Sequence, residues 1–104
     1  MVTWANWCPP CRANEGKITN ELIPVYAVSK DVIFVINDVT NKRTKNKSET
    51  NLKAIGVYEV SKNEIATGVI SLIKLVTGKV INYLKVTQSA GQIEKTINET
   101  NRSN

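Results

Sequence analysis

The sequence predicts an α/β domain with the element order β-α-β-α-β-β-α. Residues 1–5 and 32–36 are apolar stretches separated by a helix-like segment, which is the pattern of a right-handed β-α-β unit. Residues 69–76 and 79–86 are two further apolar stretches joined only by Thr77-Gly78, so they are expected to form an antiparallel hairpin. The parallel unit and the hairpin together predict a four-stranded mixed sheet flanked by helices.

The first helix is expected to run through residues 12–22 and on towards residue 29. Ile18 and Leu22 lie four residues apart on one face. Gly16 and Pro24 interrupt this helix, and a kink or an end is expected at Pro24 because it lacks the N–H that a helix interior needs. The strand at residues 32–36 is a continuous apolar run, typical of a parallel strand buried on both faces.

The polar segment at residues 38–47 is expected to be the loosest part of the chain. It contains the basic run at residues 41–47, for which a solvated loop is the simplest interpretation. A second helix is then expected to begin at Ser48 or Thr50, both good N-cap residues, and to pass through Leu52.

The last helix is predicted at residues 89–100, with Ile93 and Ile97 four residues apart and facing the sheet. The polar residues 101–104 are expected to form a disordered tail. A length of 104 residues suits one domain, which is predicted at residues 1–100.

The composition argues against several classes of protein. No stretch approaches the ~20 apolar residues of a membrane-spanning helix. The net charge is +5, but no aromatic residue is interleaved with the basic run, so nucleic-acid binding has little support. No signal peptide is visible. The expected compartment is therefore the cell envelope if an upstream signal segment is missing, and otherwise the cytoplasm.

The chemistry that the sequence predicts lies in residues 3–12. This segment contains both cysteines, Cys8 and Cys11, at C-x-x-C spacing, together with both tryptophans. Cys8 falls where the first strand ends and the first helix begins, and Pro9 and Pro10 suit the first helical turn. Unpaired backbone N–H groups in that turn stabilise a thiolate and lower its pKa.

Cys8 is therefore expected to be an exposed, ionised nucleophile. Cys11 lies one turn deeper and is expected to resolve the mixed disulfide that Cys8 forms. A structural disulfide or two inert thiols are the alternative interpretation. A bridge across so small a loop would add little stability, which favours redox use.

The W-A-N-W-C-P-P-C-R motif at residues 4–12 resembles the active-site signature of the thioredoxin superfamily. The Pro-Pro dipeptide followed by arginine is most similar to thioredoxin-like thiol reductases of the bacterial cell envelope, including those that serve cytochrome c maturation. This resemblance implies the minimal thioredoxin-like fold, with sheet order 2-1-3-4. It covers nearly the whole chain but is specific only at the motif.

The chain departs from the family pattern at the cis-proline and at its beginning. Counting back from Gly78 places the cis-proline position at Ile70, and no proline follows Pro24, so the Val69–Ile70 bond is expected to be trans. The family's N-terminal strand and helix are missing. Residues 32–36 would then form an exposed apolar edge, as in a truncated or divergent family member.

The groups that assist proton transfer also differ from those of the family. The buried acid of thioredoxin aligns with Val2, which cannot ionise, and the glutamate of many envelope reductases aligns with Asn14. Glu15 lies four residues after Cys11 on the same helical face and is the candidate base, with a merely solvated side chain as the alternative.

Trp7 resembles the indole that flanks the substrate groove in the family. With Pro9, Pro10 and Ile70, it makes up the substrate-binding residues that the resemblance implies. Trp4 points the other way along the strand and is expected in the core.

Three functions are compatible with these observations. The first is a monomeric thiol-disulfide oxidoreductase that exchanges disulfides with partner proteins and a redox donor, without cofactor or metal; the resemblance favours the reductase direction. The second is a zinc or iron–sulfur module in a dimer that shares two cysteine pairs, because such sites need four ligands and the chain has no histidine. The third is a non-catalytic remnant that binds a partner through its exposed edge.

Overall fold

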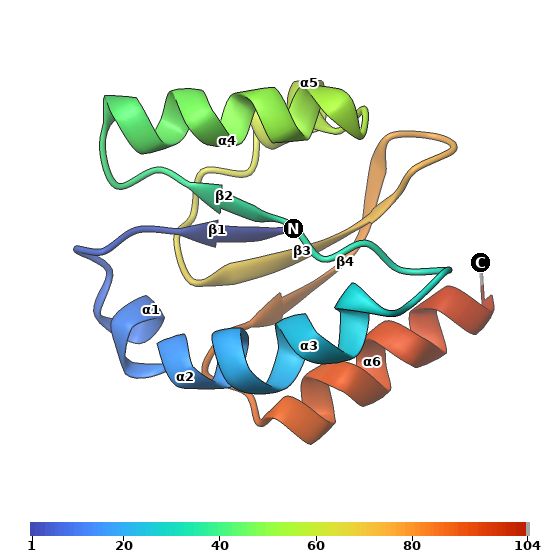
Figure 1. Cartoon of the computed structure of the whole chain (residues 1–104). Helices are drawn as coiled ribbons and strands as arrows, with labels where there is room; N and C mark the ends of the chain where they lie inside the picture. Colours follow the sequence, from blue (N-terminus) through green and yellow to red (C-terminus); the bar gives the residue numbers. More distant parts are fainter. Residues whose placement is uncertain (104) are drawn as a thin grey trace.

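A four-stranded mixed sheet separates two layers of helices in the computed structural model, which describes residues 1–103 (Figure 1). Helices α4 and α5 cover one face, and α1 to α3 with α6 cover the other. The strands are β1 (Val2–Trp4), β2 (Ile36–Asp38), β3 (Val69–Lys74) and β4 (Lys79–Lys85). The helices are α1 (Pro9–Ala13), α2 (Glu15–Lys17), the π-helical turn η1 (Ile18–Leu22), α3 (Ile23–Ala27), α4 (Lys42–Ala54), α5 (Tyr58–Ser61) and α6 (Ala90–Ser103).

The sheet has the strand order β2-β1-β3-β4. β1 pairs in parallel with β2 and antiparallel with β3, and β3 and β4 form the antiparallel hairpin. The predicted element order and mixed sheet are thus confirmed. β1 is a central strand, with β2 on one side and β3 on the other. The segment that follows β1 therefore leaves the sheet between β2 and β3.

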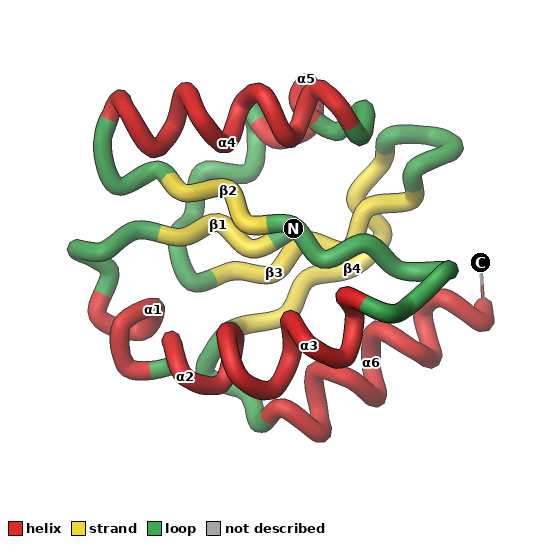
Figure 2. Tube along the Cα trace, viewed as in Figure 1, coloured by secondary structure: helices red, strands yellow, loops and turns green. Residues whose placement is uncertain are grey.

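The second strand begins later than predicted. Pairing with β1 starts at the Val2–Ile36 pair, where the Val2 N–H donates to the Val35 carbonyl at 2.9 Å, and residues 32–34 precede this pairing. Figure 2 shows this stretch as part of the long loop between α3 and β2. Ile33 is 55% exposed, so the prediction of a run buried on both faces is wrong.

Residues 9–27 form an interrupted helix. Asn14, between α1 and α2, has φ −113° and ψ 11°, outside the helical region, whereas Gly16 lies within α2. The π-helical turn η1 comes directly before α3, and its last hydrogen bond runs from the Ile23 N–H to the Ile18 carbonyl. The interruption expected at Pro24 is therefore a widened turn just before the proline.

Helix α4 starts earlier than predicted, because Asn41 caps it. The Asn41 side chain accepts the Thr44 N–H at 2.9 Å, and the Thr44 hydroxyl accepts the Asn41 N–H at 3.2 Å, which is a reciprocal capping box. The basic run is therefore helical, and the prediction of a loop is wrong. Ser48 lies buried in mid-helix, where its hydroxyl accepts the Asp38 N–H at 2.9 Å and ties α4 to β2.

The hairpin and the last helix follow the prediction closely. The turn between β3 and β4 is longer than expected, and Gly78 adopts φ +69° in it. In α6, Ile93 and Ile97 are buried against the sheet, as predicted. The helix continues to Ser103, past the predicted end, and Asn104 lies outside the described residues.

The N-terminal end of β1 lies deep in the molecule. The Met1 amine donates to the Ser71 carbonyl at 2.8 Å, and burial lowers the pKa of this amine to about 5. An apolar cavity of about 210 Å³ lies beside it, between β3 and the chain that leads into β2. No helix within residues 1–103 is long and apolar enough to cross a membrane.

Candidate functional site

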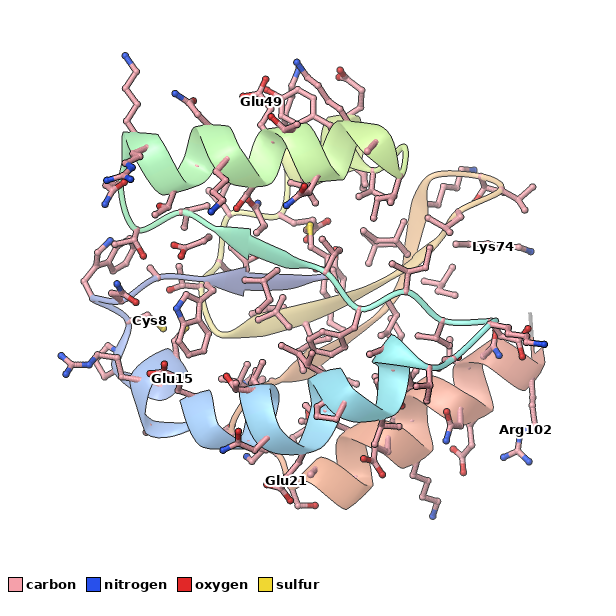
Figure 3. All side chains as sticks on the ribbon, in the orientation of Figure 1. Cys8, Glu15, Glu21, Glu49, Lys74 and Arg102 are labelled. Carbon is pink, nitrogen blue, oxygen red and sulfur yellow. The ribbon has the colours of Figure 1, made fainter. Side chains whose placement is uncertain are left out.

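The cysteine pair lies where β1 ends and α1 begins (Figure 3). The Cys8 N–H donates to the Ala5 carbonyl at 3.1 Å and closes the turn, while the Cys8 carbonyl accepts the Arg12 N–H at 3.1 Å as a first helical bond. Pro9 and Pro10 occupy the first helical positions, where a missing N–H costs no hydrogen bond. The structure thus has the junction that the motif predicts.

Both cysteines are free thiols, and both are buried. Cys11 is fully buried on the inner face of α1. The prediction of an exposed Cys8 is wrong, because this residue is only 3% exposed. Residues 67–68 pass directly over it: a Cβ atom placed on Gly68 would lie 3.7 Å from the Cys8 Sγ.

Gly68 is held in place from two sides. Its N–H donates to the Thr3 carbonyl at 2.8 Å, and its carbonyl accepts the Val86 N–H at 3.0 Å. Its φ of +80° lies in the left-handed region, where a side chain is strained. The backbone conformation next to the Cys8 thiol therefore favours a glycine at this position.

Ile70, which counting back from the hairpin glycine placed at the substrate-binding position, is the second residue of β3. It is fully buried, paired with Val2 on one side and Leu84 on the other, and belongs to the same core cluster as Cys8. The backbone that approaches the Cys8 sulfur is that of Gly68. The residues described contain no cis peptide bond, and the trans bond expected between Val69 and Ile70 is confirmed.

The surroundings of Cys8 favour its thiolate. Burial by itself raises the pKa of Cys8, but the side chains of Cys11 and Thr67 and the backbone N–H of Cys11 together lower it below the ordinary thiol value. Cys8 is the N-cap residue of α1, although its side chain makes no capping hydrogen bond of standard geometry. Proximity to the amides of the first turn supplies part of the effect.

The surroundings of Cys11 have the opposite effect. Burial raises the pKa of Cys11 to about 11, and the hydrogen bond with Cys8 adds to the increase. The backbone N–H groups of Ala5 and Gly68 oppose it only in part. Cys11 therefore stays protonated over a pH range in which Cys8 ionises.

The surface around Cys8 is formed by exposed residues of the motif. Trp7 is 62% exposed, and its indole N–H donates to the Thr40 carbonyl at 3.0 Å. The Asn6 N–H donates to the Thr40 hydroxyl at 2.8 Å, so two hydrogen bonds join the motif loop to the chain before α4. Trp4, by contrast, is buried in the core, as predicted. Pro9 and Pro10 are exposed on the other side of Cys8.

The candidate base, Glu15, is exposed at the start of α2, after the break at Asn14 (Figure 3). A residue that sequence reasoning missed is Lys17. Its ammonium donates to the Asn14 side chain at 2.7 Å and to the carbonyls of Val86 and Gln88 at 2.9 and 2.6 Å. Lys17 thus ties the first helix to the end of β4, beside Gly68. The position of Lys17 in the helix is typical of a solvent-exposed lysine, so the sequence alone did not predict this contact.

The cysteine pair lies outside two cavities of the molecule. Neither the apolar cavity of about 210 Å³ nor a second one of about 420 Å³ beside α4 and α5 is lined by Cys8 or Cys11. Within residues 1–103, no group of three histidine, cysteine or acidic residues is arranged to hold a metal ion. A cluster or zinc site would therefore need the cysteines of a second chain.

Comparisons of the chain with models of protein families, with curated proteins and with solved structures found no match. The chain is thus a small α/β domain with a C-x-x-C pair near the start of a helix.

Proposed function

We propose that this chain is a thioredoxin-like thiol-disulfide oxidoreductase, with Cys8 as nucleophile and Cys11 as resolving thiol. The observation that carries the proposal is the C-x-x-C pair at the start of α1, with Cys8 as the N-cap residue and Cys11 fully buried within the helix. The direction of the pKa shifts agrees with it, because the pKa of Cys8 is lowered and that of Cys11 is raised to about 11. Such a pair places a reactive thiolate and a protonated resolving thiol in the same helical turn. The motif and the strand order support the thioredoxin-like classification.

The reaction needs only the two thiols and a partner disulfide. The Cys8 thiolate attacks one partner sulfur, a mixed disulfide forms, and the other partner sulfur leaves as a thiolate. Cys11 then gives its proton to water or to that thiolate and attacks the Cys8 sulfur. The Cys8–Cys11 bond forms, the mixed disulfide breaks, and the second partner sulfur is released. Two electrons pass from the chain to the partner, and a donor dithiol restores the chain.

The raised pKa of Cys11 suits this order of events. While Cys11 is protonated, it stabilises the Cys8 thiolate as a hydrogen-bond donor and does not compete as a nucleophile. Once Cys8 is in the mixed disulfide, this donor role ends. Cys11 is then free to ionise and to attack. Glu15 stays a candidate base, and water is the other acceptor of the proton.

The partner is expected to bind on the exposed residues around Cys8. Trp7, Pro9 and Pro10 are the exposed neighbours of the buried Cys8 in the chain, and Gly68 is a backbone neighbour of its sulfur. No described cavity encloses the pair, which suits a partner that is itself a protein better than an enclosed small molecule. The motif resemblance favours the reductase direction.

A disulfide-reduction assay tests the proposal. With dithiothreitol as donor, the wild-type chain should accelerate insulin reduction, and Cys8→Ser should fall to the uncatalysed rate. Cys11→Ser should also lose turnover, but it should accumulate a one-to-one mixed disulfide with the substrate, detectable by mass spectrometry. Trp7→Ala should slow reduction of insulin more than reduction of a small neutral disulfide. Equal rates for wild type and Cys8→Ser would refute the proposal.

A further inference from the structure

Basic residues predominate in the segments around the cysteine pair. Among residues 1–14 the only charged side chain is that of Arg12, and residues 39–48 contain four basic residues and no acidic one. Thr67 and Gly68, which lie against Cys8, carry no charge. Acidic residues border these stretches: Glu15 follows the first, Asp38 and Glu49 flank the second, and Glu64 precedes the third. Asp38 accepts the Thr40 N–H at 3.0 Å, within its own turn.

Two hydrogen bonds hold part of this charge close to the motif. The Asn6 N–H and the Trp7 indole both donate to Thr40, and Lys42 and Arg43 follow it in the chain. Arg12 lies in α1, immediately after Cys11. The three basic residues Arg12, Lys42 and Arg43 are all exposed, and we refer to them as the basic rim.

The basic rim has no internal counter-charge. The two salt bridges within the described residues join Lys53 to Glu49 and Lys62 to Glu59, and neither involves the rim. Lys42 and Arg43 also occupy the first turn of α4, which contains no acidic residue, although the partial positive charge there favours acidic ones. The basic side chains of the rim therefore lack a salt-bridge partner within the described residues, and two of them follow the Thr40 contact of exposed Trp7.

We propose that the partner proteins of this chain carry their disulfide in an acidic segment, whose carboxylates contact the basic rim while an apolar side chain packs on Trp7. This inference rests on the proposed function, because it describes the substrate of the same two thiols. Charge complementarity of this kind speeds the encounter and selects among partners. The sulfur exchange itself is the two-step reaction given above.

The test uses three peptides, each with one internal disulfide and a fluorescent reporter, with aspartates, serines or lysines placed several residues from the cysteines. At low ionic strength, the wild-type chain should reduce the acidic peptide on the order of tenfold faster than the basic one, and salt at 0.5 M, a value chosen for strong screening, should remove most of this preference. The uncatalysed rate with dithiothreitol corrects for the intrinsic reactivity of each peptide.

Charge-reversal variants locate the preference on the surface. Lys42→Glu with Arg43→Glu should abolish or reverse it. The matched control, Lys30→Glu with Lys95→Glu, changes net charge equally at exposed sites after α3 and in α6, away from the rim, and should largely keep it. Circular dichroism of both variants checks that they fold.

The possible failures are distinguishable. If the wild-type chain reduces a small neutral disulfide but shows no preference among the peptides, or if both double variants change the preference equally, this inference is wrong and the proposed function stands. If the wild-type chain reduces none of these disulfides, the proposed function fails, and this inference fails with it.

Discussion

Gly68 lies so close to Cys8 that a Cβ atom added to it would be 3.7 Å from the thiol sulfur. Its φ of +80° is a left-handed conformation that favours glycine, and the 3.7 Å separation is an ordinary van der Waals contact. The neighbouring Thr67 interacts with the same sulfur through its side chain and helps to lower its pKa. Two residues from a distant part of the sequence therefore lie at Cys8, and one of them influences its acidity.

Replacing Gly68 with alanine should destabilise the fold. The left-handed backbone conformation costs an alanine roughly 1–2 kcal/mol, whereas the added methyl group would make only an ordinary van der Waals contact with the Cys8 sulfur. Urea denaturation should therefore show a loss in the free energy of unfolding that comes from the backbone conformation. Gly91→Ala is the control, because Gly91 lies in α6 with open space around its Cβ position. Equal behaviour of the two variants would contradict this account.

Replacing Thr67 with valine should raise the pKa of Cys8 while leaving the fold intact. Valine keeps the shape of threonine but lacks the hydroxyl that favours the thiolate. The rate of iodoacetamide alkylation, measured against pH, reports the thiolate fraction of Cys8. The midpoint in the wild-type chain should lie below that of an ordinary thiol, and in Thr67→Val it should move upward. An unchanged midpoint would show that the hydroxyl has no influence on Cys8.

The stability of the reduced chain should depend on pH in two opposite ways. Cys8 has a lowered pKa in the folded chain, so its contribution to the free energy of unfolding increases as pH rises from that pKa towards the ordinary thiol value of 9.0. Cys11 has a raised pKa of about 11 in the folded chain. Its contribution to the free energy of unfolding is therefore present below pH 9.0 and is lost as pH rises towards 11. Both effects should vanish in Cys8→Ala with Cys11→Ala. Subtracting the urea-denaturation profile of this double variant isolates them from the other titrating groups.

Replacing Lys17 with methionine should destabilise the contact between the first helix and the end of β4. The Lys17 ammonium donates to the Asn14 side chain and to two carbonyls, those of Val86 and Gln88. Leaving such partly buried acceptors without a donor costs about 1–3 kcal/mol. Lys95→Met, at an exposed position of α6, should change the free energy of unfolding by much less. A similar loss in both variants would mean that these three hydrogen bonds add nothing.

Local patterns in the sequence were sufficient for the class of fold and for the position of the thiols. Alternating apolar and helical stretches and a short connection predicted the element order, and C-x-x-C followed by two prolines predicted where the first helix starts. The start of α4 is also determined by nearby residues, those of the Asn41–Thr44 capping box, but the basic run around it was interpreted as a loop. These features depend on residues a few positions apart, which is why the sequence alone determines them.

Other features depend on contacts between segments that are far apart in the sequence. β2 exists only where β1 pairs with it, so residues 32–34 stayed outside the sheet despite their strand-like composition. The approach of Gly68 to Cys8 and the two hydrogen bonds from Lys17 to the carbonyls of Val86 and Gln88 each join segments more than fifty positions apart, and no local pattern encodes them. The physical reason is that long-range hydrogen bonds and the burial of side chains arise only when these segments pack together in the folded chain. The sequence by itself therefore identified which sulfurs to expect at the site, and the tertiary structure decided what surrounds them.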